Sequence, residues 1–113
     1  MIFSFATDQF DRLTCSLELD NIHAVATASD RVAALDDLIT AIASVEANGM
    51  GECFWLEAAG EYRWVFRREG ENVRVAVLWS AGVMTGWEHV FWAECSIAAT
   101  LGTRNAQALS NLS

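Results

Sequence analysis

Histidine is the first residue type to consider for chemistry, and the chain has two, His23 and His89. His89 follows Glu88 and a glycine-bearing loop, so it is the better placed of the two to act as a general base. Such a base needs an orienting group within hydrogen-bonding reach. Adjacent residues in a strand point to opposite faces, so Glu88 cannot orient His89 if both belong to a strand. We therefore assign no catalytic residue.

Other motifs that carry chemistry are absent from the sequence. Cys15, Cys53 and Cys95 are widely spaced, and neither they nor the histidines show the short spacings of a zinc site. No serine-nucleophile, Walker or dinucleotide-binding glycine motif occurs. We predict three buried, reduced thiols, no metal and no cofactor, and the sequence does not indicate an enzyme.

Arginine is concentrated in one part of the chain, since residues 63–74 hold four of the seven arginines. Alternation places most of them on one face of a predicted sheet, and Trp and Arg are enriched at protein interfaces. Our leading hypothesis is non-covalent association through this outer face, as a homodimer or with a protein partner. The alternative is a solvent face whose arginine stems cover apolar neighbours. The predicted contact residues are Trp55, Arg63, Val65, Arg67, Arg74 and Leu78.

Aromatic residues and a methionine surround the loop at residues 80–86, which suggests a second possible function. A pocket for a small apolar or aromatic ligand could open between this loop and the sheet. The same residue types also form ordinary core clusters, and a binding pocket needs converging polar groups. The candidate pocket residues are Trp79, Met84, Trp87, His89 and Trp92.

The composition limits the classes of partner. The net charge is −8 and there is no lysine, which argues against binding to the phosphate backbone of nucleic acids. No apolar run is long enough to span a membrane, and the N-terminus lacks the basic start of a secretory signal, so we expect a cytoplasmic protein without membrane contact. The length predicts a single domain, residues 1–113, and the 53% hydrophobic content can supply its core.

The best-defined element is a β-hairpin at residues 62–79. Aromatic residues alternate with other types at positions 62–66, and valines alternate at positions 73–77. A two-residue loop of Gly70 and Glu71 suits this hairpin, because glycine tolerates the positive φ of a type II′ turn. This loop pairs Phe66 with Val75, Trp64 with Val77 and Tyr62 with Trp79, and it places Arg67 opposite Arg74.

A second hairpin precedes the first. Residues 52–57 have the character of a strand, and residues 58–60 form a candidate three-residue loop that ends on glycine, as the common loop of this length requires. That loop pairs Leu56 with Tyr62 and Phe54 with Trp64. It therefore directs Phe54 and Leu56 to the core and Trp55 to the outer face.

The remaining elements flank this meander. Residues 13–19 alternate as a half-buried strand with residues 2–6 as a hairpin partner, while residues 22–27 form either an edge strand or a loop. A helix is predicted over residues 31–47, with Asp30 as N-cap and Gly49 as its stop. Residues 87–95 resemble a strand buried on both faces, and a final helix begins at Ser96. This order predicts an α+β fold: a mainly antiparallel sheet of five to six strands with two helices packed on its aromatic face.

Overall fold

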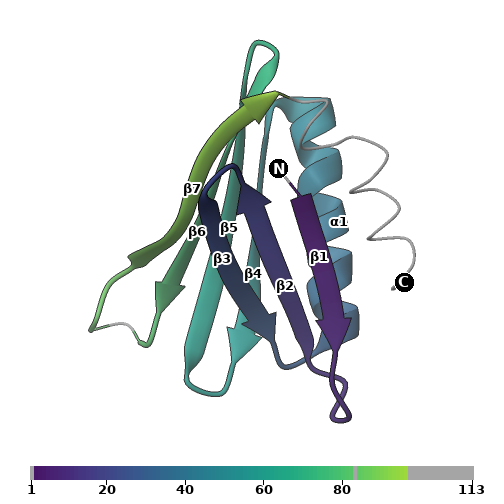
Figure 1. The fold of residues 1–113 in the computed structure, drawn as a ribbon, viewed down its shortest axis with the longest axis vertical. Coiled ribbons are helices and arrows are strands. Elements are labelled where there is room, and N and C mark those ends of the chain that lie inside the picture. The colour runs from purple at the N-terminus through teal and green to yellow at the C-terminus, as the bar shows by residue number, and fades with distance from the viewer. Residues whose placement is uncertain (1, 83, 97–113) are drawn as a thin grey trace.

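The computed structural model describes residues 2–82 and 84–96, which form two antiparallel sheets and, within these ranges, one helix (Figure 1). The prediction of one sheet of five to six strands with two helices is therefore wrong, and the helix predicted after Ser96 lies outside the described residues. The first sheet has the order β1–β2–β3 and the second β4–β5–β6–β7. The elements are β1 (Ile2–Thr7), β2 (Leu13–Leu19), β3 (Ile22–Ala28), α1 (Arg31–Asn48), β4 (Met50–Glu57), β5 (Gly60–Glu69), β6 (Asn72–Ser80) and β7 (Glu88–Ser96).

The three-stranded sheet forms from two successive hairpins. The predicted pairing of β1 with β2 is confirmed, and the ambiguous segment at residues 22–27 belongs to strand β3. Asp20 turns the chain between β2 and β3 with a left-handed φ of 52°, a conformation that aspartate tolerates better than most residues. Every second side chain of β2 is buried, as its alternation predicts: Leu13, Cys15 and Leu17.

Helix α1 begins and ends where its capping residues predict. The Asp30 side chain accepts a hydrogen bond from the backbone N–H of Ala33, and Gly49 closes the helix with a φ of 83°. Leu35, Leu38 and Val45 are buried, as are two alanines of the helix, Ala34 and Ala41. Small residues on this side let the helix approach the sheet closely.

The hairpin of β5 and β6 has the predicted register. Phe66 pairs with Val75, Trp64 with Val77, and Arg67 with Arg74. Gly70, the first loop residue, has a φ of 64°, which is the conformation that selected glycine at this position. Local alternation and turn chemistry therefore sufficed to determine this pairing.

The predicted register of β4 is wrong by one residue. Trp55, rather than Leu56, pairs with Tyr62, and Cys53, rather than Phe54, pairs with Trp64. The connecting loop has two residues instead of three, because Gly60 joins strand β5 and pairs with Glu57. A one-residue slip exchanges the two faces of a strand, so Cys53 and Trp55 enter the core while Phe54 and Leu56 face outward.

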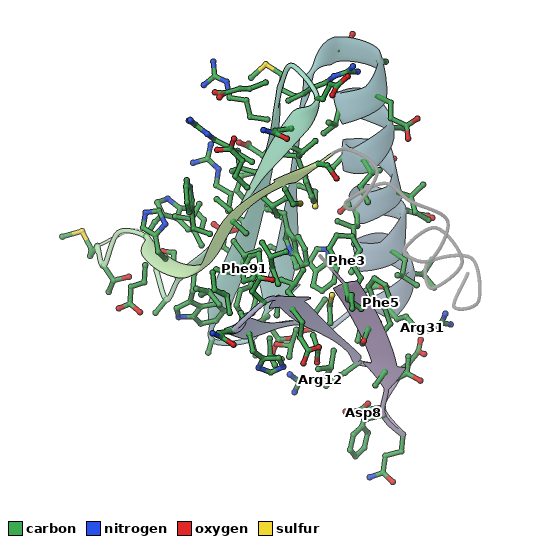
Figure 2. The ribbon with its side chains drawn as sticks, turned by 45° about the horizontal axis from the view of Figure 1, so that its top comes forward. Phe3, Phe5, Asp8, Arg12, Arg31 and Phe91 are labelled. Carbon is green, nitrogen blue, oxygen red and sulfur yellow. The ribbon has the colours of Figure 1, made fainter. Side chains whose placement is uncertain are left out.

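One continuous core joins both sheets and α1. Figure 1 shows the three-stranded sheet in front of the four-stranded sheet, with α1 running alongside them. Phe3 of β1 and Phe91 of β7 enter this core from different sheets (Figure 2). Trp64 lies fully buried at its centre, with the Phe3 ring edge-on at 6.3 Å and the Trp55 ring at 4.8 Å between centroids.

Close backbone contact explains why glycine occupies position 51. A Cβ at Gly51 would collide with the backbone carbonyl of Ala41 in α1. The helix can therefore lie directly against β4 only because this position has no side chain.

Polar contacts join the two sheets at one end. The Arg12 guanidinium lies 2.6 Å from the Glu57 carboxylate, which also accepts a hydrogen bond from the Ser29 hydroxyl. The Ser29 backbone N–H donates to the Leu56 carbonyl across 3.0 Å. Asp8 begins the loop that follows β1 and leads to Arg12 (Figure 2), and the Asp8 carboxylate accepts from the backbone N–H groups of Phe10 and Arg12. The end of β3 is thus bonded directly to the end of β4.

Candidate interaction surface

The four-stranded sheet turns one face toward the core and the other away from it. We call the second face the outer face. Among the residues that the observed registers place on it are Met50, Glu52, Phe54, Leu56, Glu61, Arg63, Val65, Arg67, Glu69, Asn72, Arg74, Ala76, Leu78, His89, Trp92 and Glu94. The predicted outer-face positions in β5 and β6 are therefore correct, and β4 and β7 complete the surface.

Large apolar side chains on the outer face are open to solvent. Leu56 is 66% exposed, Met50 57% and Trp92 53%. The expectation that β7 is buried on both faces is wrong, because Trp92 alternates with buried Phe91 and Ala93. The three exposed side chains lie at the two ends of β4 and on the opposite edge strand β7, and the partly buried Val65, Ala76 and Leu78 lie on the face between them. Scattered single hydrophobic residues are normal on a protein surface, but apolar side chains spread over one whole face are typical of an interaction site.

Arg63 organises an aromatic cluster at one end of this face. Its guanidinium lies 6.0 Å from the ring centroids of both Phe54 and Trp87, within the range of cation–π attraction. The Glu52 carboxylate accepts from Nε of Arg63 at 3.0 Å and holds the guanidinium in place. Trp87, which precedes β7, thus lies over the outer face, and its ring centroid is 6.3 Å from that of Phe54. Arginine and aromatic residues held in fixed positions are characteristic of binding hot spots.

Arg67 and Arg74 carry like charges and face each other across β5 and β6. The charge of Arg74 is compensated by nearby carboxylates. Arg74 lies 3.2 Å from the carboxylates of both Glu69 and Glu94. No ion pair of Arg67 or of Glu61 occurs among the described residues. These two opposite charges lie on the same strand, about 20 Å apart at the strand rise of 3.3 Å per residue.

Trp55 does not belong to this surface, so its prediction as a contact residue is wrong. It is 1% exposed, and its indole N–H donates to the Ala34 carbonyl of α1 across 3.1 Å. The residues that the sequence analysis missed are Met50, Phe54, Leu56 and Trp92. The sequence did contain a signal for the orientation of β4. Gly51, Cys53 and Trp55 occupy alternate positions of the strand and therefore share one face, which is the face toward the helix.

The five candidate pocket residues lie in different places. Trp79 packs against Tyr62 at 4.7 Å, Trp92 lies on the outer face, and Met84 is 94% exposed. Trp87 lines a depression of about 380 Å³, which it shares with Leu56, Gly60, Glu61, Ser80, Gly82 and Gly86. His89 is exposed in β7 and does not border it.

The described residues offer little for covalent or metal chemistry. Burial raises the pKa of Cys53 to about 12, with the nearby charges of Asp37 and Glu52 acting in the same direction. Burial also raises the pKa of Cys15, so both thiols stay protonated and unreactive at neutral pH. Across residues 2–82 and 84–96, no group of three or more His, Cys, Asp and Glu side chains is arranged to hold a metal ion. In the same ranges, no helix has the length and apolar character needed to cross a membrane.

Comparison with known proteins assigns no relatives. No protein-family model, curated protein or solved structure matches this chain. The function must therefore be inferred from the surface itself.

Proposed function

We propose that this protein acts by non-covalent self-association, in which the outer face of one copy packs against the outer face of a second copy. The observation that carries the proposal is the group of solvent-exposed apolar side chains on this face, above all Trp92, Leu56 and Met50. Burying them against a like surface removes apolar area from water, which is the main driving force of association.

The size of the outer face is compatible with a stable contact. Four strands spaced about 4.8 Å apart, each about eight residues long, cover roughly 19 by 26 Å, or about 500 Å² in flat projection. Side chains that stand out from this plane give a larger accessible area. A standard interface buries about 800 Å² on each partner, so two such faces and their rims supply a contact of this class.

Charge favours a second copy as the occupant. The chain carries a net charge of −8, so most contacts between two copies would bring acidic surfaces together. The outer face is an exception, because its three arginines nearly balance its four glutamates. Two copies can therefore meet there with the least electrostatic repulsion.

The isolated charges of Arg67 and Glu61 define how the copies are arranged. A two-fold axis running across the strands, in the plane of contact, lays the Arg67 end of one face over the Glu61 end of the other. Each copy then supplies one partner to two identical ion pairs, as an isologous interface requires. Pairs of this kind contribute to orientation and specificity more than to affinity.

Light scattering coupled to size-exclusion chromatography tests the proposal. The expected mass of the wild-type protein is twice the 12.4 kDa of one chain. Trp92→Ser removes an aromatic side chain that the contact would bury and is expected to weaken the dimer by about 30-fold or more. Arg67→Glu and Glu61→Arg should each weaken it, and the double variant should restore it. Arg68→Glu, which makes the same charge change outside the outer face, is the matched control and should leave the dimer intact.

The outcomes test separately whether the outer face associates and how the two copies are arranged. A wild-type protein that stays monomeric at millimolar concentration would overturn self-association. Loss of the dimer in Trp92→Ser, without rescue in the double charge variant, would retain the outer face but reject the two-fold arrangement.

A further inference from the structure

Strand β4 is an edge of its sheet, and its outward-facing backbone can be identified from three hydrogen bonds. In an antiparallel pair, residues that bond across to the partner alternate with residues that do not. The Arg68 N–H donates to the Gly49 carbonyl across 2.7 Å, so odd-numbered positions of this strand bond to β5. The carbonyls of Met50 and Leu56 accept bonds from Ser44 and Ser29, which lie outside the sheet. Even-numbered residues of β4 therefore direct their N–H and C=O groups to the open edge.

No strand of the described ranges pairs with the middle of this edge. The bonds from Ser44 and Ser29 close its two ends, which leaves Glu52 and Phe54 between them. Among the described residues, no hydrogen bond reaches the backbone of Glu52 or Phe54 from the open side. Both residues are exposed. Four backbone groups are thus available to a further strand. An open sheet edge can pair with another chain, either in aggregation or in specific strand addition.

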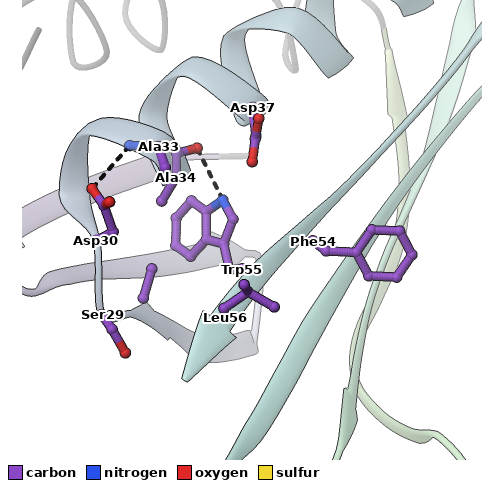
Figure 3. A pocket seen from close by; sticks show the side chains of 9 residues that line it. Ser29, Asp30, Ala33, Ala34, Asp37, Phe54, Trp55 and Leu56 are labelled. Atoms are coloured by element: carbon purple, nitrogen blue, oxygen red, sulfur yellow. Dashed lines mark hydrogen bonds between the residues drawn. The ribbon is translucent and has the colours of Figure 1, made fainter. Parts of the chain in front are cut away.

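A hollow of about 450 Å³ borders the same edge (Figure 3). It lies where β3 ends, α1 begins and β4 passes beneath the helix, and it is lined mainly by apolar groups: Ala28, Ala33, Ala34, Trp55 and Leu56. In Figure 3 the Phe54 ring points away from this hollow, toward the outer face, so Phe54 borders it through its backbone. An apolar side chain of a strand added to β4 could enter the hollow from the edge.

The border of the hollow is acidic. Asp30 and Asp37 both line it. Asp30 already accepts the N–H of Ala33 as the helix cap, whereas Asp37 has no ion pair among the described residues and is exposed. With a chain charge of −8, the field around the hollow attracts cations.

We propose that β4 binds an extended, basic peptide segment of a partner protein by strand addition. The backbone of the segment pairs with Glu52 and Phe54, one of its apolar side chains enters the hollow, and a Lys or Arg two residues away, on the same face of the segment, meets Asp37. Main-chain hydrogen bonds supply affinity in this mode, while the side-chain pockets supply specificity. This site uses backbone groups at the edge of the sheet, whereas self-association uses side chains that stand out from the outer face, and Leu56 borders both.

A fluorescein-labelled peptide that carries valine and lysine two residues apart on one face, with threonine at the positions between, is the probe. A length of about seven residues matches the roughly 20 Å between Met50 and Leu56. Fluorescence anisotropy should show saturable binding of this peptide and none of a version with glutamate in place of each lysine. A third version, N-methylated on the backbone nitrogens that face β4, cannot donate to the strand and should not bind. Hydrogen exchange of the Phe54 amide should slow when the lysine peptide is bound.

Protein variants separate strand addition from general charge attraction. Asp37→Asn should weaken binding about fivefold, as expected for loss of one partly exposed ion pair. Asp36→Asn makes the same charge change beside it but outside the hollow, and should have no effect. Phe54→Pro removes the outward N–H without disturbing the bonds to β5, whereas Phe54→Ala retains that N–H. The first should abolish binding and the second should preserve it.

Several results would overturn the proposal. These are absence of binding at millimolar peptide, equal effects of Asp36→Asn and Asp37→Asn, or a Phe54 amide that exchanges equally fast with and without peptide. If Phe54→Pro does not fold, the amide exchange of the wild-type protein decides. Arg67→Glu, which disrupts only the proposed dimer, should bind the peptide normally, so the two proposals can fail independently.

Discussion

Two buried tryptophans in the core differ in a single hydrogen bond, and this difference can be measured. Trp55 and Trp64 are 1% and 0% exposed, and their rings lie 4.8 Å apart. The Trp55 indole N–H donates to the Ala34 carbonyl. The Trp64 indole N–H is buried and has no acceptor in the described part of the chain. Replacing either tryptophan with phenylalanine removes a similar side-chain volume. The change at Trp55 also removes a hydrogen bond, whereas the change at Trp64 removes a buried N–H that has no acceptor.

The two variants should therefore differ in their free energies of unfolding. The smaller ring costs about 1–2 kcal/mol through lost burial and a small cavity. In Trp55→Phe, loss of a satisfied hydrogen bond adds about 1 kcal/mol, which gives a total of about 2–3 kcal/mol. In Trp64→Phe, removal of an unsatisfied buried donor returns about 1–3 kcal/mol, which leaves a net change near zero. The expected gap between the variants is about 2–3 kcal/mol.

Urea unfolding followed by far-ultraviolet circular dichroism measures this gap without relying on tryptophan fluorescence. Unchanged slopes with urea concentration would show that both variants unfold from the same native fold. A gap of about 1 kcal/mol or less would refute the reasoning, because the lost Trp55 hydrogen bond alone would account for it and the unsatisfied N–H would carry no cost.

Three further predictions concern the helix, its contact with β4 and a buried thiol. Gly51→Ala should lower the free energy of unfolding by about 2–3 kcal/mol, since its Cβ meets the Ala41 carbonyl. Gly82→Ala, which meets nothing, should be nearly neutral in the same urea titration. Asp30→Ala removes the cap of α1 and should cost about 1 kcal/mol in thermal unfolding; an unchanged transition would show that the cap contributes nothing. The folded-state pKa of Cys53 is raised from 9.0 to about 12, so its contribution to stability is complete below about pH 9 and is lost as the pH rises toward 12. Between these pH values, the free energy of unfolding should fall by up to about 1.4 kcal/mol per pH unit because of this thiol. Cys53→Ala should lack this part of the fall.

The outer face could be predicted for two of its four strands. Arg63, Val65 and Arg67 alternate with aromatic residues in β5, and one glycine turn transfers that parity to β6. For β4 the sequence predicted a three-residue loop that ends on Gly60, whereas the structure has a two-residue loop. The contact of α1 with Gly51 decides between them, and it joins positions that sequence patterns do not connect.

Local chemistry by itself determined the limits of α1 and the pairing of β5 with β6. A cap, a left-handed glycine and a two-residue turn act within a few residues, so their effects can be recognised without knowing the rest of the fold. Tertiary structure alone decided that the strands divide into two sheets and that Trp55 faces inward. It also decided that Arg67 and Glu61 remain without ion-pair partners in the described part of the chain. These outcomes depend on which surfaces pack together, and packing brings together residues that lie far apart in the chain.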